Sequence, residues 1–128
     1  MALSDCRVGA TIAVSNMERA REFYEDRLGL VPGPMDEPQG AVYECGDGTT
    51  LLVYQSEHAG KATATVATWE VPDLDQAVEE LGSKGIAFEQ YTEPLATDEG
   101  GIHSMGGRRV AWFRDPDGNT IALGEVRR

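Results

Sequence analysis

The stretch VAWFRDPDGNTIALGEV, from Val110 to Val126, decides the fold of this chain. It contains two apolar runs on either side of the turn DPDGN at 115–119. Pro116 fixes its own φ angle and cannot donate to a strand ladder, whereas Gly118 can take a positive φ. A turn of this composition between two apolar runs is typical of a β-hairpin.

The chain contains a second, weaker copy of this pattern. DGTTLL at 47–52 aligns with DGNTIA at 117–122. The two halves also begin alike, because Asn16 and Asp73 each precede a helical pattern. Both are good N-cap residues, since a short side-chain oxygen can accept a free first-turn N–H, and a glycine ends each apolar stripe. The sequence therefore predicts an internal repeat of two βαβββ modules in an α+β fold.

The halves differ in length near the end of the second one. The starts are offset by 57 residues (71 − 14) and the turns by 70 (117 − 47), so the second half holds about 13 extra residues. We expect them in a loop from Pro94 to Gly107, and we expect that loop to act as a lid, because long loops are usually functional or mobile. The expected strands are 7–14, 30–35, 41–45, 50–55, 62–71, 86–93, 108–114 and 120–125, and the expected helices are 17–28 and 74–84.

Two motifs carry a resemblance to a known family. IAVSNMERAREFYEDRLGL at 12–30 and WFRDPDGNTIAL at 112–123, in this order, resemble the vicinal oxygen chelate superfamily. That superfamily includes glyoxalase I, extradiol dioxygenases, fosfomycin resistance enzymes and bleomycin-binding proteins. The resemblance implies one domain over residues 1–128, with an open, curved, eight-stranded mixed sheet. Module one would span about 7–55, a linker 56–61 and module two about 62–125.

Composition narrows the classes of function. The chain has 128 residues, 41% of them hydrophobic and 26% charged, which suits one globular domain. No apolar run approaches the roughly 20 residues of a membrane span, and the N-terminus lacks the pattern of a secretory signal, so we expect a cytoplasmic protein. The net charge of −11 argues against nucleic acid and is compatible with a cationic ligand. Cys6 and Cys45 have no metal-site spacing.

The resemblance also implies four metal-ligand positions, and none of them carries a donor atom. Carried over by motif, the positions are Gly9, Leu52, Val66 and Ala122. A divalent cation needs side-chain lone pairs, so we expect no metal and no cofactor. Of the two histidines, His58 lies in the polar linker and is expected to be solvated. His103 lies in the long loop, where ligand contact and simple exposure are both open.

The same registers predict an apolar pocket with a few hydroxyl groups and large aromatic side chains, which is typical of sites for small organic molecules. Trp112 is its main aromatic candidate, with core packing as the alternative. Trp69 is expected on the opposite face, under a helix. The predicted ligand-binding residues are Thr11, Leu52, Tyr54, Val66, Thr68, His103, Met105, Val110, Trp112 and Ala122, with Gly124 on the same face.

Three functions remain open. The first is a metal-free protein that binds a small organic molecule, resembling the bleomycin-binding branch and sequestering an antibiotic or another cationic or aromatic metabolite. The second is a lyase, isomerase or dioxygenase-type enzyme with an atypical or absent metal site. The third is a degenerate subunit whose cavity is packed shut and whose role is association. In each case exposed sheet edges favour a symmetric homodimer, with no nucleic-acid or membrane partner.

Overall fold

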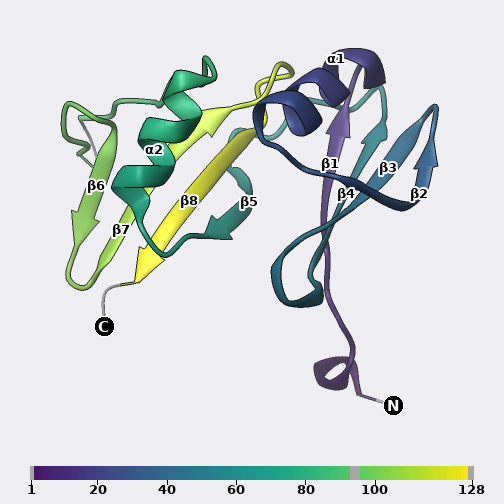
Figure 1. The fold of residues 1–128 in the computed structure, drawn as a ribbon, viewed down its shortest axis with the longest axis horizontal. Coiled ribbons are helices and arrows are strands. Elements are labelled where there is room, and N and C mark those ends of the chain that lie inside the picture. The colour runs from purple at the N-terminus through teal and green to yellow at the C-terminus, as the bar shows by residue number, and fades with distance from the viewer. Residues whose placement is uncertain (1, 93–95, 127–128) are drawn as a thin grey trace.

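A computed structural model describes residues 2–92 and 96–126 (Figure 1). Two similar units follow each other, here called module one (residues 10–55) and module two (residues 65–126). Module one contains β1 (Ala10–Val14), α1 (Met17–Arg21) with a π-helical continuation (Glu22–Arg27), β2 (Pro32–Glu37), β3 (Gly40–Glu44) and β4 (Thr50–Gln55). Module two contains β5 (Thr65–Glu70), α2 (Leu74–Ser83), β6 (Ile102–Met105), β7 (Arg108–Arg114) and β8 (Thr120–Val126).

The strands form two four-stranded mixed sheets with the same topology. Their orders are β1-β4-β3-β2 and β5-β8-β7-β6, and in each sheet the first strand pairs in parallel with the last. The edge strands β1 and β5 contact each other, which brings the two sheets side by side (Figure 1). The α+β fold with tandem modules is therefore confirmed, and the eight strands divide into two open sheets.

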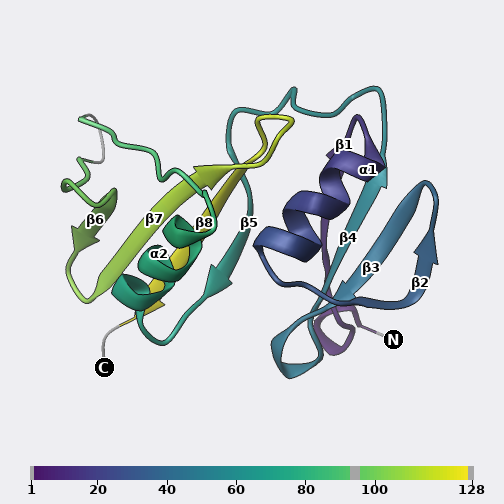
Figure 2. The same ribbon diagram turned by 45° about the horizontal axis from the view of Figure 1, so that its top comes forward.

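Both helices lie on the same side of the sheets (Figure 2). Each begins at the residue that the sequence indicates: the Asn16 side chain accepts from Arg19 N, and the Asp73 side chain accepts from Gln76 N, both at 3.1 Å. The helices cover the core, whose largest fully buried side chains are Tyr24, Tyr43, Phe113, Ile12, Leu51, Leu74 and Ile121. The opposite sheet faces, here called the open faces, carry no helix.

One predicted strand is wrong. Residues 86–93 were expected to form a strand, but their described part has only an isolated bridge, Phe88 to Phe113. The edge of the second sheet is instead β6, which lies inside the segment that we expected to be a loop. The turn between β6 and β7 is Gly106-Gly107, with Gly106 at φ 59°. A two-residue glycine turn lets β6 fold back directly onto β7, and β6 takes the edge position that a strand over 86–93 would need.

The turn at 115–119 holds the two modules together. Asp115 is only 5% exposed and accepts hydrogen bonds from the backbone N–H groups of Asp117 and Asn119. Its Oδ2 also accepts from the Tyr24 hydroxyl of module one at 2.7 Å. Asn119 donates to the carbonyl of Ala13 at 2.9 Å. A buried carboxylate that receives this many donors is well satisfied.

Asp117 adds a second set of bonds across the same joint. Its carboxylate accepts from the Ser15 N–H at 3.1 Å, the Ser15 hydroxyl at 2.5 Å and the Arg19 guanidinium at 3.1 Å. Ser15 and Arg19 lie at the start of α1, where the helix dipole also favours a negative charge. The stretch that decides the fold of module two is therefore also the stretch that docks onto module one.

Candidate functional site

The structure places the predicted ligand-binding residues on the open faces of both sheets. In module one, Thr11 pairs with Leu52 across β1 and β4, and Tyr54 follows two residues later on the same face. Thr11 is exposed, Leu52 half-buried and Tyr54 38% exposed. These three residues form one group on the sheet of module one. The predicted residues of module two lie on the other sheet.

The second group follows the register of module two. Thr68 and Trp112 both pair with Ala122, and Val110 pairs with both Gly124 and His103. Met105 lies two residues after His103 on the same strand and is 60% exposed. Paired residues point to the same side of a sheet, so this group shares one face. Val66, two residues before Thr68, is half-buried and packs against the hydrophobic core, and the pairing of β5 is irregular at that point.

His103 lies on β6 and not in a long loop, which corrects its predicted setting. Its Nδ1 is 2.7 Å from the carbonyl oxygen of Ala96. A carbonyl only accepts, so Nδ1 carries the proton and donates. The other ring nitrogen, Nε2, is buried and has no hydrogen-bond partner within the described structure. An unsatisfied buried acceptor costs about 1–3 kcal/mol, which makes Nε2 the most conspicuous unused polar atom on this face.

Trp112 is the centre of an aromatic cluster on the same face. Its ring centroid is 6.4 Å from that of His103, with the planes tilted by 37°, and 5.4 Å from that of Tyr91 in an edge-on arrangement. Trp112 is half-buried and is not among the residues of the hydrophobic core cluster. A large ring outside the core, beside two other rings, leaves surface against which a flat molecule can pack.

Tyr91 was not among the predicted residues. It is tied to the next segment, since its N–H donates to the Thr97 hydroxyl and its carbonyl accepts from Thr97 N–H. Glu89 N–H donates to the carbonyl of Trp112, so this segment runs beside β7. The sequence did show that an aromatic residue, Tyr91, lies in a segment expected to be a strand. Only the hydrogen bond between Glu89 and Trp112 shows that this segment lies beside β7.

The four positions at which the family places metal ligands do not fit a metal here. Leu52, Val66 and Ala122 offer only apolar side chains. At Gly9 there is also little room, because a Cβ built there would lie 2.7 Å from the Thr50 hydroxyl. Within residues 2–92 and 96–126, no group of three or more His, Cys, Asp or Glu residues is placed to hold a metal ion. His58 is exposed in the linker beside Glu57, as expected.

A separate hollow of about 690 Å³ lies between the modules. Of the predicted ligand-binding residues only Thr68 is among the described residues that line it. Trp69, Ala67 and Leu51, which point to the helix side of their sheets, contribute its apolar surface. Trp69 is half-buried against the core, on the face opposite Trp112, as its strand position predicts. This hollow, here called the inter-module groove, was not predicted.

The sequence matches the family described as "Glyoxalase/Bleomycin resistance protein/Dioxygenase superfamily" over residues 8–123. The chain belongs to this superfamily. A search of curated protein sequences found no significant match. Among solved structures, a glyoxalase/bleomycin resistance protein from Catenulispora acidiphila is similar, with 28% identity, a TM-score of 0.67 and coverage of 94% of this chain and 97% of that one.

Two further solved structures share the fold at lower identity. Lactoylglutathione lyase from Agrobacterium tumefaciens has 19% identity and a TM-score of 0.69, covering 94% of this chain and 93% of that one. TnmS3, described as an antibiotic binding protein from Streptomyces sp. CB03234, has 20% identity and a TM-score of 0.64, covering 93% and 95%. The superfamily fold thus hosts both an enzyme and a binding protein, so the fold alone does not decide the activity. No helix in the described residues has the length and apolar character to cross a membrane.

Proposed function

We propose that this superfamily member binds a small organic molecule on the open face of module two, against Trp112, without a resident metal. One observation carries the proposal: His103 Nε2 is buried and unpaired beside a Trp112 ring that lies outside the core. A ligand that stacks on the ring gains apolar contact, and one whose N–H or O–H displaces the atoms covering Nε2 also satisfies that nitrogen.

The surroundings of Trp112 support a pocket of this kind. Val110 and Gly124 lie on the same face and supply small apolar surface, and Ala122, only 3% exposed, is on that face too. Thr68 adds a hydroxyl next to Ala122. Sites for small molecules combine a mostly apolar lining with a few polar groups that orient the ligand.

The ligand class that we favour is a cationic or flat aromatic metabolite, including an antibiotic. The net charge of −11 attracts cations, and Trp112 offers a face for cation–π contact. The similar fold of TnmS3, an antibiotic binding protein, agrees with such a role. The proposal includes a symmetric homodimer, which would cover exposed apolar side chains such as Met105 and Tyr54. Light scattering that gives a monomer mass at micromolar concentrations contradicts the dimer.

The enzymatic alternative lacks its metal ligands. Metal-assisted isomerisation or ring cleavage needs a cation held by several side chains, and the four family positions provide none. We therefore expect purified protein to carry no stoichiometric metal after dialysis and to keep its melting temperature in the presence of a chelator. One retained equivalent of Zn, Ni, Mn or Fe contradicts the metal-free proposal.

The test uses bleomycin as the probe, together with native mass spectrometry for any molecule that purifies with the protein. Trp112→Ala should weaken bleomycin binding by about 1–3 kcal/mol, because a stacking surface is lost. His103→Phe keeps a ring and removes the lone pair, so it should weaken binding of a donor-bearing ligand to a similar extent. Calorimetric titration measures both variants, and Trp69→Phe on the opposite sheet face is the control.

Thermal unfolding of the same variants separates a pocket from a core. If Trp112 only filled the core, its truncation would lower the free energy of unfolding by about 3–5 kcal/mol and leave binding by the folded protein intact. That result overturns the placement of the site on this face. A stable variant with weakened binding supports it.

A further inference from the structure

The peptide that joins Ala96 to Thr97 is held at both of its polar groups. Its N–H belongs to Thr97 and donates to the Tyr91 carbonyl at 2.9 Å. Its carbonyl belongs to Ala96 and accepts from His103 Nδ1 at 2.7 Å. The N–H and C=O of a planar trans peptide point in opposite directions. The peptide therefore lies between Tyr91 and His103, and it cannot rotate without breaking both hydrogen bonds.

The Thr97 hydroxyl adds two further bonds to the same partner. Its oxygen accepts from the Tyr91 N–H at 2.8 Å, and its hydrogen is donated to the Tyr91 carbonyl at 3.3 Å. Thr97 thus binds both backbone groups of Tyr91, and these contacts are here called the Tyr91–Thr97 bonds. Valine has the shape of threonine but no hydroxyl, so it would leave the Tyr91 N–H without this acceptor.

The chain between Thr97 and His103 is held by a turn. Asp98 N–H donates to the Ile102 carbonyl at 2.8 Å, and Ile102 N–H donates to the Asp98 carboxylate at 2.9 Å. Ile102 is only 6% exposed and directly precedes His103. The chain's own bonds therefore place the Ala96 carbonyl opposite the His103 ring, and a site that is arranged before binding loses less entropy when a ligand arrives.

This arrangement fixes the tautomer of neutral His103. The nitrogen that carries the proton in a neutral imidazole is set by the hydrogen bond that the ring makes. With the proton on Nδ1, the ring donates to Ala96 and Nε2 keeps its lone pair. The opposite tautomer would place two acceptors 2.7 Å apart and would bury an N–H without a partner, which costs stability twice. Beside Trp112, the neutral His103 ring can therefore only accept a hydrogen bond.

We infer that Thr97 is the positioning residue that keeps His103 in the Nδ1–H tautomer, and that the open face of module two thereby selects flat ligands whose ring carries a hydrogen-bond donor. The inference rests on the proposed function, because it concerns a ligand stacked against Trp112. Thr97 acts through the Ala96 carbonyl and the His103 ring and needs no contact with the ligand. A donor that displaces the atoms covering Nε2 gains a hydrogen bond there, whereas an isostere with only an acceptor meets a second lone pair.

The tautomer can be measured in the ligand-free protein. Nitrogen-15 chemical shifts distinguish the protonated from the unprotonated nitrogen of a neutral imidazole, and His58→Gln leaves His103 as the only histidine. We expect the proton on Nδ1. Thr97→Val should increase the share of the Nε2–H tautomer, whereas Thr97→Ser keeps the hydroxyl and should restore the original spectrum. Thr92→Val makes the same chemical change at an exposed threonine of the same segment and should leave the tautomer unchanged.

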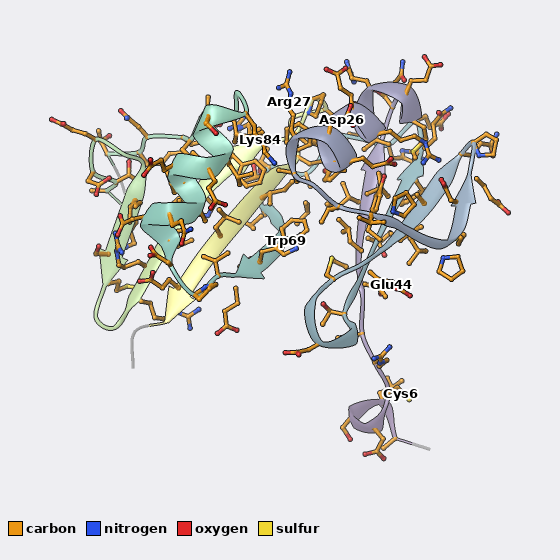
Figure 3. The ribbon with its side chains drawn as sticks, in the orientation of Figure 1. Cys6, Asp26, Arg27, Glu44, Trp69 and Lys84 are labelled. Atoms are coloured by element: carbon orange, nitrogen blue, oxygen red, sulfur yellow. The ribbon has the colours of Figure 1, made fainter. Side chains whose placement is uncertain are left out.

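The selectivity is measured with indole and benzofuran, which have the same flat shape and differ in a ring N–H against a ring oxygen. Binding is followed at the side-chain N–H resonance of Trp112. Trp69 lies between the two modules, away from β6 (Figure 3), so Trp69→Phe removes the second tryptophan signal without altering the site. Indole should bind about three- to tenfold more tightly than benzofuran, as expected for one hydrogen bond. Thr97→Val should bring this ratio toward one, and Thr97→Ser should keep it.

Three results overturn the inference: a wild-type ring that carries its proton on Nε2, Thr97→Val and Thr92→Val variants with the same tautomer, or equal affinities for indole and benzofuran. The first and the third need no variant of Thr97, so they decide the matter even if Thr97→Val does not fold. If neither probe binds, the proposed function and the selectivity fall together. The ligand-free spectra still decide whether Thr97 sets the tautomer, which keeps the two failures distinguishable.

Discussion

Two buried tyrosines depend on carboxylates of the same chain. Tyr24 is fully buried, and its hydroxyl donates to Asp115, while the buried Tyr43 donates to Glu25 at 2.8 Å. Burial is the main cause that raises the pKa of Tyr24 above its ordinary value, and the negative charge of Asp115 raises it further. Burial followed by the bond to Glu25 raises the pKa of Tyr43 in the same direction. Both phenols therefore remain donors while the protein is folded.

These raised pKa values predict a loss of stability in alkali. The unfolded chain releases its phenol protons near the ordinary pKa, while the folded chain still holds them. The free energy of unfolding should therefore be unaffected below about pH 10 and fall above it by about 1.4 kcal/mol per pH unit for each tyrosine. Urea unfolding between about pH 8 and pH 11 measures this slope.

Phenylalanine variants test the cause. Tyr24→Phe should lower the free energy of unfolding at neutral pH by about 1.5–3 kcal/mol, because a hydrogen bond to a charged group is lost. It should also make the alkaline slope shallower, since one titrating group is gone. A variant with the wild-type slope contradicts the assignment. Tyr54→Phe, at an exposed tyrosine, is the control and should change neither quantity.

At the scale of elements, the end of α2 contains two glycines with opposite roles. Gly82 lies inside the helix, and a Cβ at this position would have no neighbouring atom within 4 Å. Gly85 lies just beyond the C-cap residue Lys84 and has φ 89°. Ile86 N–H donates to the carbonyl of Leu81, which closes the helix end. A left-handed residue at this position is the usual way to end a helix, and glycine adopts it without a steric penalty.

Alanine at these two positions should therefore shift stability in opposite directions. Gly82→Ala should raise the free energy of unfolding by about 0.5–1 kcal/mol, because alanine is the better helix former. Gly85→Ala should lower it by about 1–2 kcal/mol, because alanine resists a positive φ. Thermal unfolding of the pair measures both effects under one set of conditions. Shifts of the same sign would show that Gly85 does not set the end of α2.

The elements also show where sequence reasoning succeeds and where it fails. Helix starts were predictable because Asn16 and Asp73 act within their own first turn. The β6 strand was not predictable, because segments that are distant in the sequence compete to pair with the same side of β7. The signal that decides this competition is the Gly106-Gly107 turn, which the prediction assigned to a loop.

The candidate site was predictable only where the geometry of a single strand or strand pair decides which face a residue lies on. Strand alternation placed Trp112 and Ala122 on one face, and the observed register pairs them. Alternation says nothing about contacts between segments, so it did not associate Tyr91 with Trp112 or His103 with Ala96. The inter-module groove was missed entirely, because its walls come from three segments whose mutual placement depends on how the modules dock.

That docking is the main feature at the scale of the whole molecule. The bonds between Ser15 and Asp117 join residues that are 102 positions apart. Turn chemistry predicted the hairpin at 115–119, but Asp117 in the same turn also binds Ser15 and Arg19 at the start of α1. Asp117 is therefore expected to couple the two modules during unfolding.

Asp117→Ala should lower the free energy of unfolding by about 2–3 kcal/mol, because several hydrogen bonds to one charged, mostly buried group are lost together. Trp69 and Trp112 both report on module two, whereas far-UV circular dichroism reports on both modules. In the wild type the two probes should follow one transition, and in the variant they should separate. Asp26→Ala, at an exposed carboxylate of module one, is the control and should keep a single transition. If Asp117→Ala keeps coincident transitions at the wild-type midpoint, the turn is not what joins the modules, and the groove between them would need another support.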